Sequence, residues 1–190
     1  MKQTILRYCG FIVLSLLVVF AMSGGEVVRV GIAWQPSTRS YDRAILSIEQ
    51  AGGEAVILPQ MRPAGFEYDG MSLSPDYFDE SGVLRQQYAD IVKRDTYHGT
   101  DADELLAGVQ AVVFLGGGDI SSTLFAVPQT WHGIADDSPA DATRDVSEYL
   151  TMAYCLDHDI PVLGCAAACR CWVSCREHLS SRTCRLTLKV

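Results

Sequence analysis

The stretch Asp159-Ile160-Pro161-Val162-Leu163-Gly164-Cys165 decides the fold that the sequence predicts. It is a short run of β-branched residues and leucine that follows a helical pattern, which is typical of a buried parallel strand in an α/β sheet. The carboxyl ends of such strands face the ligand crevice, and a nucleophile on the turn from strand to helix is exposed there. We therefore expect the chemistry of the protein to lie just after Gly164.

The mature chain opens with a pattern of strand, helix and strand. Residues 27–33 and 55–59 are apolar runs, and residues 41–51 between them place apolar side chains at the spacing of a helix with one buried face. Gly52-Gly53 ends that helix, as glycine after the last turn commonly does. This β-α-β unit predicts a parallel sheet with a right-handed crossover.

The middle of the chain is less regular until a third strand appears. Residues 62–99 are interrupted by proline and glycine, and we expect a long connection or insertion with a helix near residues 83–93. A short helix is expected at residues 101–106, capped by Thr100 or Asp101.

A buried strand, residues 109–115, then runs into Gly116-Gly117-Gly118-Asp119. Glycines at this place allow positive φ and can turn backbone N–H groups toward an anion, although a tight turn explains them equally well.

One more helix leads to the strand that ends at Gly164. Residues 144–156 place five apolar side chains on one face (Val146, Tyr149, Leu150, Ala153 and Leu156), and Thr143 or Asp145 is the expected cap. The predicted fold class is α/β, with a mostly parallel sheet and helices on both faces.

Composition limits the class of protein. The chain has 190 residues, of which 48% are hydrophobic, and this suits one globular domain. The net charge of −8 argues against nucleic acid as a partner, because phosphate binding requires clustered Lys and Arg.

The N-terminus resembles an export signal. Lys2 and Arg7 precede an apolar run at residues 8–22, and Ser23-Gly24-Gly25 supplies small residues for cleavage. We expect residues 1–24 to be a signal peptide and the protein to be exported to the periplasm or outside the cell. An uncleaved membrane anchor and a buried element of the fold are the alternatives, and we expect contact with a membrane only through this segment.

Three features together resemble the class I glutamine amidotransferase-like superfamily. They are residues 115–120, the Arg144-Asp145 pair with Glu148 at the start of a helix, and Ile160-Pro161-Val162-Leu163-Gly164. Within the superfamily, the sequence is most similar to the γ-glutamyl-γ-aminobutyrate hydrolase family, over roughly residues 27–164, so residues 25–165 are expected to form part of such a domain.

This resemblance implies a cysteine hydrolase that acts on a small γ-glutamyl or glutamine-like substrate without a cofactor or a metal. Gly116, Gly117 and Asp119 match the segment that forms the oxyanion hole in that family. The family then continues, one residue after the strand, into Cys-Arg-Gly-Met-Gln, whose cysteine attacks the γ-glutamyl amide, and a later histidine and glutamate complete the triad.

The chain departs from the family directly after Gly164. The residue in register with the family nucleophile is Ala166, and Cys165 is the catalytic candidate if the chain is active. Residues 166–190 also differ in composition, because they carry a net charge of +4 against −12 for the rest, and the last 26 residues hold five of the seven cysteines.

A shift of reading frame accounts for this departure. If the last base of each codon is joined to the first two bases of the next, residues 165–172 can be decoded as Cys-Arg-Gly-Met-Gln-Met-Leu, and the fit continues to Cys184. We therefore expect residues 166–190 to be an out-of-frame tail, and the chain to be a truncated, inactive form. The alternatives are a cysteine-rich metal site or disulfide cluster in the tail, and an exported binding module without catalysis. The sequence leaves the oligomeric state open.

Overall fold

The computed structural model describes residues 27–36, 41–118, 120–127 and 140–164. The predicted signal peptide at residues 1–24 and the predicted out-of-frame tail at residues 166–190 lie outside the described residues. The same holds for Asp119 and Cys165.

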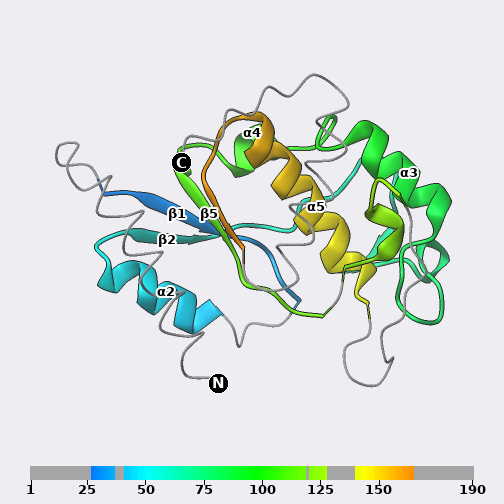
Figure 1. The fold of residues 1–190 in the computed structure, drawn as a ribbon, viewed down its shortest axis with the longest axis horizontal. Helices are drawn as coiled ribbons and strands as arrows, with labels where there is room; N and C mark the ends of the chain where they lie inside the picture. The colour runs from blue at the N-terminus through cyan, green and yellow to red at the C-terminus, as the bar shows by residue number, and fades with distance from the viewer. Residues whose placement is uncertain (1–26, 37–40, 119, 128–139, 165–190) are drawn as a thin grey trace.

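The centre of the described chain is a four-stranded sheet in which all neighbouring strands are parallel (Figure 1). Its strand order is β2-β1-β5-β6. The strands are β1 (Arg29–Ile32), β2 (Glu54–Ile57), β5 (Ala111–Phe114) and β6 (Val162–Gly164). The prediction of an α/β fold with a parallel sheet is confirmed, and each strand is shorter than the apolar run that predicted it.

Helices cover both faces of this sheet. Helix α2 (Tyr41–Gln50) belongs to a hydrophobic cluster that includes Val113, whereas helix α5 (Ala142–Asp157) belongs to a second cluster that includes Val112 and Phe114. Successive side chains of a strand point to opposite faces, so neighbours in β5 join different clusters. Figure 1 shows the two helices on either side of the strands.

Residues 62–99 form a small substructure of their own beside α5. It contains an antiparallel pair of short strands and helix α3, which confirms the helix expected near residues 83–93. The remaining elements are β3 (Tyr68–Asp69), β4 (Ser72–Leu73), η2 (Pro75–Tyr77), α3 (Gln86–Asp95), α4 (Ala102–Leu105) and η3 (Ser122–Leu124).

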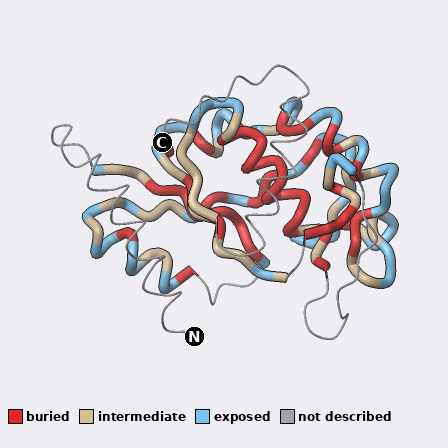
Figure 2. The backbone as a smooth tube through the Cα atoms, viewed as in Figure 1, coloured by how far each residue is buried: buried red, intermediate tan, exposed pale blue. Residues whose placement is uncertain are grey.

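Helix α5 is buried on nearly all sides, and not only along the face that carries the apolar side chains identified in the sequence. Buried residues run from Arg144 to Cys155 without interruption, while Leu156 is only half-buried (Figure 2). The reason is that residues 61–84 cover the side of α5 that faces away from the sheet. Ser147 Oγ accepts a hydrogen bond from Met61 N at 3.0 Å, so even the polar side of the helix is used internally.

The cap of α5 also differs from the prediction of Thr143 or Asp145. The helix begins at Ala142, and the side chain of Asp141 accepts a hydrogen bond from Arg144 N at 3.1 Å. Thr143 Oγ1 instead accepts from Leu73 N at 3.0 Å, and Asp145 is committed to contacts inside the fold. Both side chains that were expected to cap the helix therefore form hydrogen bonds with other parts of the fold instead.

Strand β6 pairs with β5 in the parallel sense that was predicted, but its residues are half-buried rather than buried. Within the described residues, β5 is its one neighbour in the sheet, so one side of β6 lacks a covering strand there. In the described ranges, no helix has the length and apolar character needed to cross a membrane.

Candidate functional site at the carboxyl ends of the strands

The glycine segment lies where the sequence predicted it, at the carboxyl end of β5. Phe114 pairs with Gly164 in the parallel register, so β5 and β6 end side by side. Gly116 has a φ of 75°, a conformation that favours glycine. This conformation is compatible both with an anion-binding segment and with a tight turn. Strand β6 therefore ends beside the start of the glycine segment.

Gln35, which follows β1, ties the glycine segment to α5. Its side-chain Nε2 donates to Gly116 O at 3.0 Å and to Glu148 Oε1 at 2.7 Å. Its backbone is fixed by Tyr41, whose hydroxyl accepts from Gln35 N at 2.5 Å and donates to Gln35 O at 3.2 Å. The first glycine carbonyl is thus held from one side by a buried amide.

Arg144 holds the other end of the segment. Its Nη2 donates to Gly118 O at 3.0 Å and to Asp145 Oδ1 at 2.6 Å, and the guanidinium passes directly over Gly117. A Cβ atom placed on Gly117 would lie 2.4 Å from Arg144 Nη1, so this position has no room for a side chain. The close approach explains glycine at residue 117 by contact rather than by backbone conformation.

Asp145 connects the arginine to the backbone that continues from the glycine segment. Its Oδ2 accepts from Ser121 N at 2.6 Å and from Ser121 Oγ at 2.8 Å. Ser121 Oγ accepts in turn from Leu84 N at 3.0 Å, which links the site to residues 62–99. The Arg144-Asp145 pair therefore fixes the segment rather than presenting charge to solvent.

Both buried carboxyl groups of this network have raised pKa values. Burial raises the pKa of Asp145 to about 6, against the opposing effect of Arg144 and the Ser121 hydrogen bonds. Burial also raises the pKa of Glu148 to about 7, with Arg144 opposing the change and the negative charge of Asp145 adding to it. Near neutral pH, Glu148 therefore exchanges a proton while Arg144 keeps its charge.

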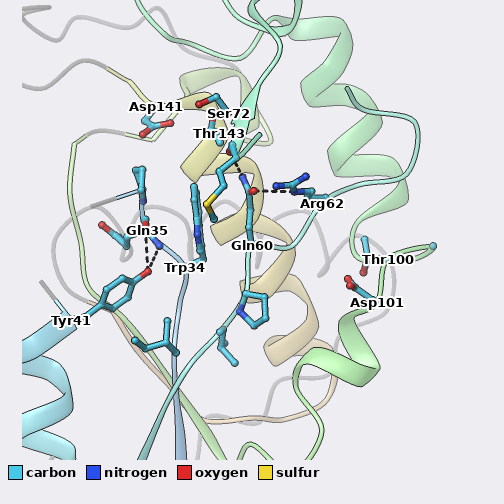
Figure 3. Close-up of a pocket in the computed structure, with 16 residues that line it drawn as sticks. Trp34, Gln35, Tyr41, Gln60, Arg62, Ser72, Thr100, Asp101, Asp141 and Thr143 are labelled. Carbon is cyan, nitrogen blue, oxygen red and sulfur yellow. Dashed lines mark hydrogen bonds between the residues drawn. The ribbon is translucent and has the colours of Figure 1, made fainter. Parts of the chain in front are cut away.

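A large cavity of about 1030 Å³ opens beside this network (Figure 3). Gln35 and Tyr41 belong both to its wall and to the network described above. The glycine segment does not line it, so the cavity and the predicted oxyanion site are neighbours that share Gln35. The lining residues include Trp34, Pro36, Ile57, Pro59, Gln60, Arg62, Met71, Thr100, Asp101, Asp141 and Thr143.

Sequence reasoning placed Gly116 and Gly117 correctly at a strand end but missed Gln35, Tyr41 and the cavity. The residues directly after β1 could have been found by the same rule that identified the glycines, because all parallel strands end at one edge. The role of residues 60–62 and 71–72 carried no such signal, since they come from the irregular connection.

No cluster suited to a metal ion occurs in the part of the chain that the structure describes. Cys155 in α5 is buried. The cysteine-rich metal site and the disulfide cluster considered above fall on residues 165–190, outside the described residues.

Comparison of the chain with models of known protein families gives no match, and comparison with curated proteins gives none either. The resemblance to amidotransferase-like hydrolases therefore depends on the motifs quoted above.

Proposed function

We propose that the chain carries the framework of an exported γ-glutamyl amide hydrolase of the glutamine amidotransferase-like type, closest to the γ-glutamyl-γ-aminobutyrate hydrolases. The observation that supports this most directly is the pairing of Phe114 with Gly164. It brings the end of the strand that precedes the expected nucleophile beside the glycine segment expected to bind the oxyanion. The ligand class is a small γ-glutamyl or glutamine-like amide.

The proposed reaction needs a thiolate and hydrogen-bond donors at one point. The thiolate sulfur attacks the amide carbon, the carbonyl oxygen becomes an oxyanion, and the amine leaves with a proton to give a thioester that water hydrolyses. Gly116 and Gly117 would supply backbone donors to the oxyanion. Gln35 donates to Gly116 O and Arg144 donates to Gly118 O, so both ends of the segment are fixed. Donors that are fixed before the reaction stabilise developing charge most effectively.

The chain as it is read after Gly164 is proposed to bind without turnover. Ala166 stands in register with the family nucleophile and has no group that can attack a carbonyl. Cys165 stands one residue before that position in the sequence. Losing the nucleophile of a triad typically lowers the rate by several orders of magnitude.

The test compares two proteins made from the same gene. One is the 190-residue chain, and the other results from inserting one base between the codons of Gly164 and Cys165, which restores the elbow cysteine. We expect release of glutamate from γ-glutamyl amides by the restored protein and none by the 190-residue chain. Replacement of the restored elbow cysteine by alanine is the matched control and is expected to abolish release.

Two results would contradict this proposal. One is turnover by the 190-residue chain that disappears on Cys165→Ala. The other is a folded, soluble restored protein that releases no glutamate from any γ-glutamyl amide.

A binding module without catalysis is the second candidate function. The cavity favours it, because about 1030 Å³ is enough volume for a small-molecule ligand. Stabilisation by a γ-glutamyl compound without glutamate release from either protein would select this function.

A further inference from the structure

The cavity has an apolar wall that remains open to solvent. Met71 and Ile57 line it, and they are 56% and 49% exposed, which places both among the exposed large hydrophobic residues of the described chain. Trp34 and Pro59 continue this surface toward the ends of β1 and β2. Covering exposed apolar side chains with a ligand is favourable in proportion to the area removed from water, so this wall suits an apolar segment.

Carboxylates outnumber basic side chains among the described residues that line the cavity. Asp101 and Asp141 line it from different sides, as Figure 3 shows, and neither forms a salt bridge within the described residues. Among the lining residues that the structure describes, Arg62 is the one Lys or Arg. Two carboxylates against one guanidinium favour a cation over an anion.

Arg62 is also engaged by the fold itself. Its Nε donates to Gln60 Oε1 at 2.9 Å and its Nη2 donates to Gly70 O at 2.8 Å. The guanidinium lies over the ring of Tyr68, 4.5 Å from the ring centroid. These contacts fix Arg62 in the wall, so it is poorly placed to turn toward an anionic ligand.

Hydrogen bonds join separate parts of the cavity wall. Gln60 Nε2 donates to Met71 O at 2.9 Å, and Thr143 Oγ1 accepts from Leu73 N at 3.0 Å. These bonds join the end of β2, the short antiparallel strands and the start of α5 around one space. A cavity whose walls are fixed before binding loses less free energy when a ligand enters.

We propose that this cavity binds a small amphipathic amine, with its apolar segment against Trp34, Ile57 and Met71 and its ammonium group at Asp101 or Asp141. The proposal goes beyond the hydrolase framework, because it concerns a separate set of residues and binding that is measured without turnover. Under this proposal the two carboxylates of the cavity bind the ammonium group, which is a role separate from that of the glycine segment.

The test uses three probes with the same apolar chain: hexylamine, hexanol and hexanoate. Binding to the full 190-residue chain is measured by calorimetric titration at low ionic strength. We expect hexylamine to bind at least about threefold more tightly than hexanol, because contacts between solvent-exposed opposite charges have that order of strength. Hexanoate is expected to bind most weakly, and added salt should reduce the preference for the amine.

Substitutions then locate the ammonium group. In Asp101→Asn/Asp141→Asn the preference for hexylamine over hexanol should disappear while hexanol binding stays unchanged. Asparagine is a good helix cap, so Asp141→Asn should retain the start of α5. Glu49→Gln is the matched control, since Glu49 is an exposed carboxylate of α2 outside the cavity, and it should keep the preference.

Three results would overturn the proposal. These are binding of hexanoate as tight as that of hexylamine, no measurable binding of any probe, and an unchanged preference in the double variant. The order of the three probes on the unaltered chain decides the matter even if a variant does not fold.

Discussion

Replacing Glu148 by glutamine should remove a pH dependence of stability that the structure assigns to this one carboxyl group. Glu148 is 3% exposed, and burial raises its pKa from 4.5 to about 7. An acid whose pKa is higher in the folded state holds its proton more tightly there than in the unfolded chain. The free energy of unfolding therefore falls as the pH rises from about 4.5 to about 7.

The size of the effect follows from the size of the shift. A change from 4.5 to about 7 in the pKa of Glu148 corresponds to about 3 kcal/mol between the protonated and ionised forms. Glutamine keeps an oxygen that can accept from Gln35 Nε2 but cannot ionise. The difference in unfolding free energy between variant and unaltered chain should thus change by about 3 kcal/mol between about pH 4.5 and about pH 7.5, in favour of the variant at the higher pH.

The measurement is urea unfolding of both proteins at a series of pH values. Subtracting the two profiles removes the contribution of groups that titrate equally in both. Asp145 is coupled to Glu148 and has a raised pKa that gives a slope of the same sign, so its response belongs to the measured difference. Glu49→Gln is the control, because it makes the same chemical change on an exposed position and should leave the profile unaltered. Parallel profiles for the unaltered chain and Glu148→Gln would refute this account of the buried network.

Two further predictions concern the same region of the fold. Gly117→Ala should lower the free energy of unfolding by about 1–3 kcal/mol in urea titrations, because the new methyl group would clash with the guanidinium of Arg144. Hydrogen bonds to Asp145 and Gly118 O hold that guanidinium in place. An unchanged unfolding midpoint would contradict this prediction. Tyr68→Phe should leave the melting temperature unchanged or raise it, since the buried Tyr68 hydroxyl has no hydrogen-bond partner among the described residues. Tyr41→Phe should instead lower the free energy of unfolding by about 1 kcal/mol, because two hydrogen bonds to Gln35 are lost. Equal effects of the two substitutions would contradict this difference.

Much of the fold could be predicted because its signals are local. The parallel strands and helix α2 follow from short apolar runs, the spacing of apolar side chains in residues 41–51 and the glycines after them. Gly116 and Gly117 were placed at a strand end for the same reason, since parallel strands all end at one edge of the sheet. These features require no knowledge of which distant residues become neighbours.

The burial of α5 and the role of its polar residues could not be predicted in this way. Arg144, Asp145 and Glu148 at the start of a helix look like an exposed charged face, and periodicity assigns them to solvent. They are buried because they contact the segments that follow β1 and β5. Glu148 accepts from Gln35, Arg144 donates to Gly118 O and Asp145 accepts from Ser121, and all three are long-range contacts. A capping preference such as that of Thr143 is weak, about 1 kcal/mol, so a tertiary hydrogen bond to Leu73 can override it.

The sequence by itself determined the α/β class, the order of the main elements and the strand end at which chemistry is expected, because each depends on local pattern and on the fixed direction of parallel strands. It also carried the change in composition after Gly164, where the last 26 residues hold five of the seven cysteines. Tertiary structure alone decided that Gln35, Glu148 and Arg144 surround the glycine segment and that a cavity opens next to it. Those residues lie far apart in the chain, and the low-dielectric interior that raises the pKa of Glu148 exists only once the segments that follow β1 and β5 have packed against α5.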